Sequence, residues 1–174
     1  CRSSLQLIDA SQDTDRVATW SVITTNQPNA PPQWQYVTLS GIATKSTLLI
    51  GITGNGDFYV DDIKLVAGSV PEVGSNYIQN GDFESGVASP WIFGGDVSVR
   101  GASGSPDFRF GGGTVSQEGK FAAIFNSADT APNGIISQAF ATSLGVQYTV
   151  AFDYGVTPPG CCSNTKSIVA QARG

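Results

Sequence analysis

The chain has 174 residues, of which 40% are hydrophobic and 13% are charged, and its formal net charge is −5. This composition excludes an acidic disordered chain, and no apolar run is long enough to cross a bilayer as a helix. The chain has no basic stretch, which argues against a nucleic-acid partner. Its length is enough to bury a sizeable core in one domain or two small ones.

The first third of the chain is rich in short apolar or alternating segments, which predict strands. We expect them at residues 4–9, 19–24, 34–40, 46–53 and 58–66. The segment 67–75 that follows is small and contains proline, and it is typical of a linker. The rest of the chain predicts further strands at residues 76–84, 119–127, 134–140, 146–156 and 166–172. No segment shows a helical period with caps, so we expect an all-β protein.

Alternation divides the strand at 58–66 between two faces of its sheet. The face that we expect to point inward carries Tyr59, Asp61, Ile63 and Leu65. The face that we expect to meet water carries Phe58, Val60, Asp62 and Lys64. An inward Asp61 needs a cation, backbone N–H groups or an arginine as its partner.

Several segments together resemble those of one family. They are WQYVTLSG at 34–41, DFYVDDIKLV at 57–66, NGDFESG at 80–86, EGKFAAIF at 118–125, ISQAF at 136–140 and GVQYTVAFDYG at 145–155. The set resembles galactose-binding-like jelly-roll modules, which include carbohydrate-binding module families 4, 9 and 22 and related cell-wall β-sandwich modules. The resemblance implies a jelly-roll β-sandwich. In that family NGDFE opens the module and the FYVDDIKL strand closes it, so this chain carries the two halves in the opposite order.

This order divides the chain into a closing half at 1–66, a linker at 67–75 and an opening half at 76–174. Three arrangements are open. The chain is a permuted single module, or a slice of a tandem array, or a subunit whose halves complete neighbouring subunits. Half a jelly roll leaves strand edges and core exposed, so each half needs a complement. Sharing halves between chains makes a contact that does not close on itself and generates a filament or ring.

The resemblance also implies a structural calcium ion where the first and last strands meet. Carried onto this chain, the candidate ligands are Asp61, Asp82 and Glu84, with backbone carbonyls near Gly119 and Lys120. Oxygen-rich sets of this kind suit Ca²⁺. The alternative is that Asp82 and Glu84 are turn residues and that Asp61 accepts hydrogen bonds from local N–H groups.

A sugar-binding surface needs exposed aromatic rings beside polar groups, because pyranose rings stack on aromatic faces. We expect exposure for Trp20, Tyr36, Phe108, Phe110 and Tyr154. We expect a core position for Trp34, Phe83, Trp91, Phe121, Tyr148 and Phe152. The loop at 100–113 carries two of the exposed rings and has the composition of a segment that binds either a ligand or a neighbouring subunit.

The three cysteines are Cys1, Cys161 and Cys162, and the β-rich texture with few lysines favours an oxidising, extracellular setting. We expect a disulfide from Cys1 to Cys161 or Cys162, within a subunit or across a junction; a lipid-bearing Cys1 is the alternative.

Catalysis is not expected, because the chain has no histidine and no spacing that singles out a pair of carboxylates. The leading hypothesis is an extracellular structural protein, a subunit or repeat of a surface fibre that polymerises with itself by sharing strands. The second hypothesis is a carbohydrate-binding module with a polysaccharide partner.

Overall fold

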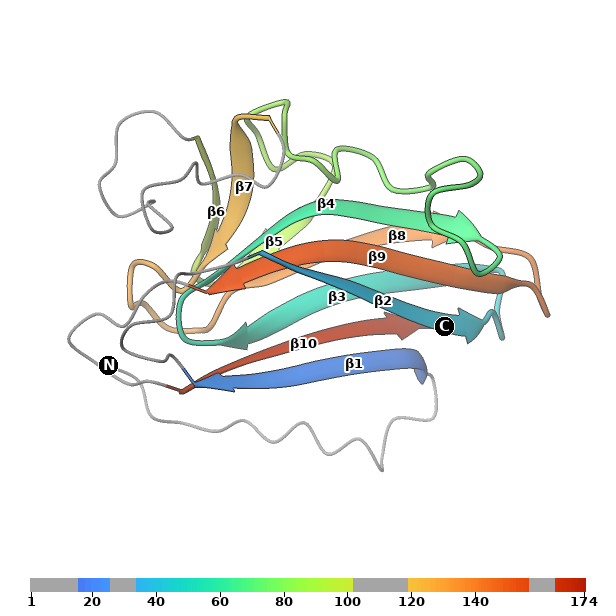
Figure 1. Cartoon of the computed structure of the whole chain (residues 1–174), viewed down its shortest axis with the longest axis horizontal. Helices are drawn as coiled ribbons and strands as arrows, with labels where there is room; N and C mark the ends of the chain where they lie inside the picture. The colour runs from blue at the N-terminus through green and yellow to red at the C-terminus, as the bar shows by residue number, and fades with distance from the viewer. Residues whose placement is uncertain (1–15, 26–33, 102–118, 157–164) are drawn as a thin grey trace.

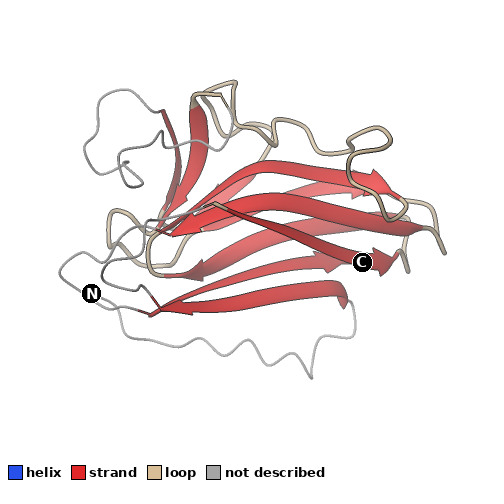
Figure 2. Cartoon of the chain, in the orientation of Figure 1, coloured by secondary structure: helices blue, strands red, loops and turns tan. Residues whose placement is uncertain are grey.

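The computed structural model describes residues 16–25, 34–101, 119–156 and 165–174. Within these ranges every regular element is a strand, and the strands form two antiparallel five-stranded sheets packed as a sandwich (Figures 1 and 2). The prediction of an all-β chain and a β-sandwich is therefore confirmed. No helix in the described part of the chain is long and apolar enough to span a membrane.

The first sheet has the strand order β1-β10-β3-β8-β5. Its bounds are β1 Arg16–Thr25, β10 Thr165–Arg173, β3 Thr47–Asn55, β8 Ile135–Ala141 and β5 Ile92–Gly94. The second sheet has the order β2-β9-β4-β7-β6. Its bounds are β2 Gln35–Ile42, β9 Gln147–Val156, β4 Phe58–Ala67, β7 Phe121–Phe125 and β6 Val97–Gly101. In Figure 1 the short β6–β7 pair turns up from the long strands of its sheet.

Strands from the two ends of the chain alternate in both sheets. β10 lies between β1 and β3, and β9 lies between β2 and β4. In the described part of the chain, β1, β2, β3 and β4 thus each pair with a strand that follows residue 76. The two segments complete each other here as one sandwich, with residues 67–75 connecting them.

One main core fills the space between the sheets. It draws on both chain segments, with Ile50, Ile52 and Phe58 from the first and Phe125, Ile136 and Phe152 from the second, all almost fully buried. The rings of Phe58 and Phe125 stack at a centroid separation of 4.3 Å. Because the core draws on both segments, neither has a closed core without the other. Burial of apolar area is the main stabilising term in folding, so each segment depends on the other for stability.

The expected faces of β4 are wrong at its start and right at its end. Phe58 and Val60 belong to the main core, whereas Tyr59 packs with Ile124 and Trp34 in a second cluster on the outer face. The register with β9 shifts between Asp61 and Lys64, and Asp62 has a positive φ of 50°. This β-bulge reverses the alternation, so Ile63 and Leu65 point inward as expected. Asp61 is fully buried but lies on the outer face.

The expected strand at 76–84 is also wrong, because this segment contains turns and no regular strand. Asn80 and Phe83 have φ values of 52° and 56°, which interrupt extended backbone. The segment closes the sandwich through other bonds. Gly81 accepts from the Ile63 N–H at 2.9 Å, and the Gln79 backbone exchanges two hydrogen bonds with the Gln138 side chain.

Asn126 joins the two chain segments through a buried side-chain amide. Its Nδ2 donates to the carbonyls of Gly54 at 3.1 Å and Gly56 at 2.9 Å, and its Oδ1 accepts from the Gly134 N–H at 2.8 Å. The residue is 6% exposed and has a φ of 61°. Loss of the amide would leave several backbone groups without their partner in a site that water reaches poorly.

Replacing Asn126 by glycine should lower the free energy of unfolding by about 2 kcal/mol. Glycine accepts the positive φ, so this variant isolates the lost hydrogen bonds from backbone strain. Asn126→Ala should cost about 1 kcal/mol more, because alanine adds strain at that φ. Urea unfolding of the three proteins measures both steps. Equal midpoints for the natural protein and Asn126→Gly would contradict the assignment.

Candidate functional site

An aromatic side chain and two carboxylates share a row across the outer face of the second sheet. Tyr36 of β2 is the register partner of Asp153 of β9, which is the partner of Asp61 of β4. Tyr36 is 55% exposed, whereas Asp153 is 7% exposed and Asp61 is fully buried. The row therefore presents an open ring beside two recessed carboxylates, both of which have interacting partners of their own.

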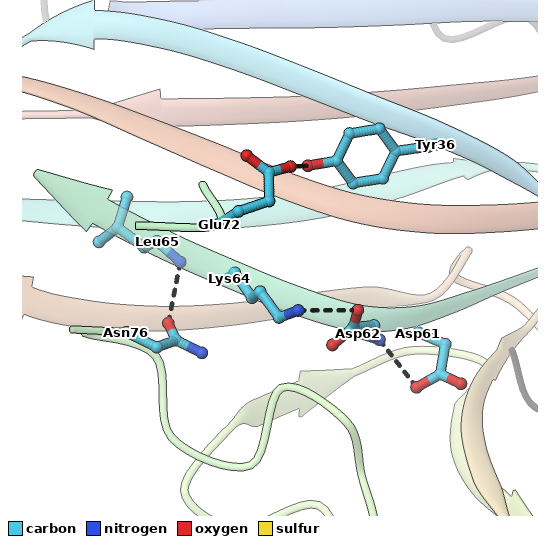
Figure 3. A network of polar contacts seen from close by, with 7 residues as sticks. All are labelled: Tyr36, Asp61, Asp62, Lys64, Leu65, Glu72 and Asn76. Atoms are coloured by element: carbon cyan, nitrogen blue, oxygen red, sulfur yellow. Dashed lines mark hydrogen bonds and ion pairs between the residues drawn. The ribbon is translucent and has the colours of Figure 1, made fainter. Parts of the chain in front are cut away.

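The loop after β4 holds the Tyr36 ring in place. The Tyr36 hydroxyl donates to Glu72 Oε1 at 3.2 Å (Figure 3). The pKa of Tyr36 lies above its ordinary value of 10.0, first because burial disfavours the phenolate and then because the Glu72 carboxylate accepts a hydrogen bond from the hydroxyl and repels the phenolate. Asp153 and Asp62 add to the repulsion. The surroundings of the ring are thus acidic.

The bulge in β4 arranges the charged groups beside this row. The Asp62 N–H donates to Asp61 Oδ1 at 2.8 Å, which binds the buried carboxylate to the turned backbone. Lys64 Nζ lies 3.2 Å from Asp62 Oδ2, and Figure 3 shows this pair between the Tyr36–Glu72 and Asp61 side chains. In the same view, the Leu65 N–H donates to Asn76 Oδ1 at 2.9 Å, which anchors the end of the connecting loop to β4.

Hydroxyl groups continue the polar surface away from the carboxylates. Ser40 and Thr149 are register partners whose hydroxyl oxygens lie 2.8 Å apart, and Thr149 also donates to the Gly68 carbonyl at 2.6 Å. Thr38 is exposed between Tyr36 and Ser40 on β2. The face therefore combines an exposed ring with hydroxyl, carboxylate and ammonium groups, which can stack on and hydrogen-bond to a polyhydroxylated ligand.

The predicted aromatic platforms have different outcomes. Tyr36 is exposed as expected, but the expected exposure of Tyr154 is wrong. Tyr154 is 8% exposed in the main core, because β9 alternation points it inward with Phe152. Trp20 lies in β1 and its side chain is outside the described part, as are Phe108 and Phe110.

Two aromatic residues near the surface, Trp34 and Tyr77, were not among the predicted platforms. Trp34, which we expected in the main core, is only partly buried and packs on Tyr59 of the outer face, with ring centroids 6.3 Å apart. Tyr77 is 44% exposed. Its position in a segment expected to be a strand of the core hid it, and the neighbouring Asn76 and Asn80 were the available signal for a turn.

The predicted calcium residues lie in two settings. Glu84 Oε1 accepts from the N–H groups of Lys120 at 2.6 Å and Phe121 at 2.8 Å, and Asp82 Oδ1 accepts from the Glu84 N–H at 3.2 Å. Both acidic side chains are exposed, whereas Asp61 is fully buried. Among the described residues, no three His, Cys, Asp or Glu side chains form a group that could hold a metal ion. Calcium binding stays a prediction.

The disulfide prediction concerns Cys1, Cys161 and Cys162, which all lie outside the described residues.

Comparison with family models, curated proteins and solved structures found no match.

Replacing Glu72 by glutamine should lower the pKa of Tyr36 toward its ordinary value, because the repulsion between Glu72 and the phenolate disappears. Burial of the hydroxyl and its hydrogen bond to Glu72 raise the pKa on folding, so the stability linked to the protonated hydroxyl is fully present below the ordinary tyrosine pKa and is lost as pH rises through the raised value. Spectrophotometric titration measures the shift, and Tyr36→Phe identifies the signal. Tyr154, whose pKa burial alone raises, is the internal control and should not move. An unchanged Tyr36 titration in Glu72→Gln would refute the contact.

Proposed function

We propose that this chain is a non-catalytic, extracellular carbohydrate-binding module of the galactose-binding-like jelly-roll type. The ligand would lie on the outer face of the second sheet, across β2, β9 and β4. The observation that carries the proposal is the Tyr36 row, in which an exposed ring fixed by Glu72 lies beside carboxylates and hydroxyls on a rigid sheet. Fixing the ring before binding lowers the entropy cost of immobilising it in a complex.

The charges of this face favour a neutral polysaccharide over an acidic one. Glu72 and Asp62 bring carboxylates to the surface, and the recessed Asp61 and Asp153 add negative charge behind them, whereas the Lys64 ammonium group is paired with Asp62. Bringing uronate or sulfate groups onto this surface would place like charges together in a partly desolvated site. Sugar hydroxyls instead donate to carboxylates without that cost.

A surface fibre that polymerises by exchanging chain halves is the other expectation. The reason for expecting it is that each half needs a complement, and here the strands β1–β4 and the strands β5–β10 supply that complement to each other. Exchange between neighbours would reuse the same strand pairs without adding to them. The intrachain arrangement therefore favours the binding module as the simpler proposal.

A structural calcium ion is part of the proposal, with Asp61, Asp82, Glu84 and the backbone near Lys120 as its candidate ligands. If the ion binds only the native state, thorough chelation should lower the melting temperature and added calcium should restore it. Magnesium at the same concentration is the control, because its tighter octahedral geometry fits an irregular oxygen set poorly. An unchanged melt, together with absence of calcium by elemental analysis, would remove the ion from the proposal.

The sugar-binding proposal is tested by electrophoresis in native gels that contain neutral polysaccharides of different linkage. The natural protein should be retarded by at least one of them, and Tyr36→Ala should weaken the retardation about tenfold, which corresponds to about 1.4 kcal/mol. Ile42→Ala is the matched control, because Ile42 is also exposed on β2 but lies at the far end of the face. No retardation in any neutral polysaccharide, or equal retardation of Tyr36→Ala, would overturn the proposal.

A further inference from the structure

A groove follows the edge of β8 where β5 ends. β5 pairs only with Ile135, Ile136 and Ser137, so residues 138–141 of β8 have a strand neighbour on the β3 side alone. An open groove of about 530 Å3 lies here, lined by Tyr77, Gln79, Pro90, Ile92 and residues 138–141. None of these lining residues carries a charge.

The backbone of β8 presents unused hydrogen-bonding groups to this groove. The Thr142 N–H donates to the Ser46 carbonyl, and this bond extends the β3–β8 ladder by one residue pair. Because hydrogen-bond directions alternate along an antiparallel strand, Gln138 and Phe140 also bond toward β3, and the N–H and C=O groups of Ala139 and Ala141 face the groove. Natural sheets protect such an edge with a charge, a proline or a bulge. β8 has none of these between residues 138 and 141.

We propose that this edge pairs with the same edge of a second copy of the chain, about a two-fold axis at Phe140. The sheet order would then continue from β8 of one copy to β8 of the other. Ala139 would pair with Ala141 of the second copy and the reverse, with about four backbone hydrogen bonds in all. β8 ends at Ala141 and β5 begins opposite Ser137, so the open stretch of one copy ends where β5 of the other begins.

Charge and side-chain size both favour a second copy as the occupant. Each chain has a net charge of −5, so two copies repel each other overall, and an uncharged patch is where they meet at least cost. Ala139 and Ala141 are exposed and small, so they do not obstruct a neighbouring strand. Tyr77 and Ile92, which are 44% and 69% exposed, would bury apolar surface away from water in the pair. The contact is short, so we expect weak association with a Kd of roughly 0.1–1 mM.

Two substitutions test the edge without touching the β3 ladder. Ala139→Pro removes an N–H that faces the groove, and Ala141→Lys places a charge there. Thr47→Lys is the matched control, because Thr47 is exposed on β3 as the register partner of Ala141, one strand away from the edge. Circular dichroism confirms that each variant is folded.

Sedimentation equilibrium over a concentration series measures the association. The mass of the natural protein and of Thr47→Lys should rise from 18.1 kDa toward twice that value, whereas Ala139→Pro and Ala141→Lys should stay at the monomer mass. Hydrogen exchange should show new protection of the Ala139 and Ala141 amides at high concentration, with no change at Phe140. A natural protein that stays monomeric at 1 mM, including one whose groove instead takes a neutral oligosaccharide, would overturn the proposal. A dimer that survives both edge substitutions would overturn it too.

Discussion

The structure depends on strand pairing between chain segments that are far apart in the sequence. β10 fits between β1 and β3, and β9 fits between β2 and β4, so each insertion joins the two ends of the chain. The core between the sheets draws on the same two segments. Each of these contacts closes a long loop, and loop closure costs conformational entropy. The two sheets therefore stabilise each other, because the shared core offsets that cost only when both are formed. The positions of Tyr36 on β2 and Ala139 on β8 follow from that pairing.

The bulge at Asp62 divides β4 into two parts whose side chains alternate in opposite phase. Before the bulge, Phe58 and Val60 fill the core while Tyr59 and Asp61 stand on the outer face; after it, Ile63 and Leu65 take over the core positions. A strand without the bulge would either bury Asp61 in the apolar core or expose Ile63. The single positive φ of Asp62 thus allows a carboxylate row and a continuous core to share one strand.

The sequence predicted the strands whose apolar period is long and regular. Strands β2, β3, β8, β9 and β10 begin and end within two residues of their expected positions, because alternation on a half-buried sheet leaves a clear pattern. It could not predict the reversal in β4, since Asp61-Asp62 fits an unbroken alternation equally well. It also missed β5 and β6, which have three and five residues and too little pattern to distinguish them from loop. Tyr36 was found because it alternates with apolar residues, whereas the tertiary contact with Glu72 that holds it has no local signal.

The connecting loop and the segment after it contribute to both candidate surfaces. Glu72 holds the Tyr36 ring on the outer face of the second sheet, and Tyr77 stands at the β8 groove with its ring edge-on to Tyr148, at a centroid separation of 5.8 Å. Between them, Asn76 Oδ1 accepts from the N–H groups of Leu65 and Ile78, which fixes the backbone on either side of the turn. A loop that only connected two halves would need no such contacts. Because this one short segment is bonded to both sheets, the Tyr36 ring and the wall of the β8 groove are held by the same stretch of backbone.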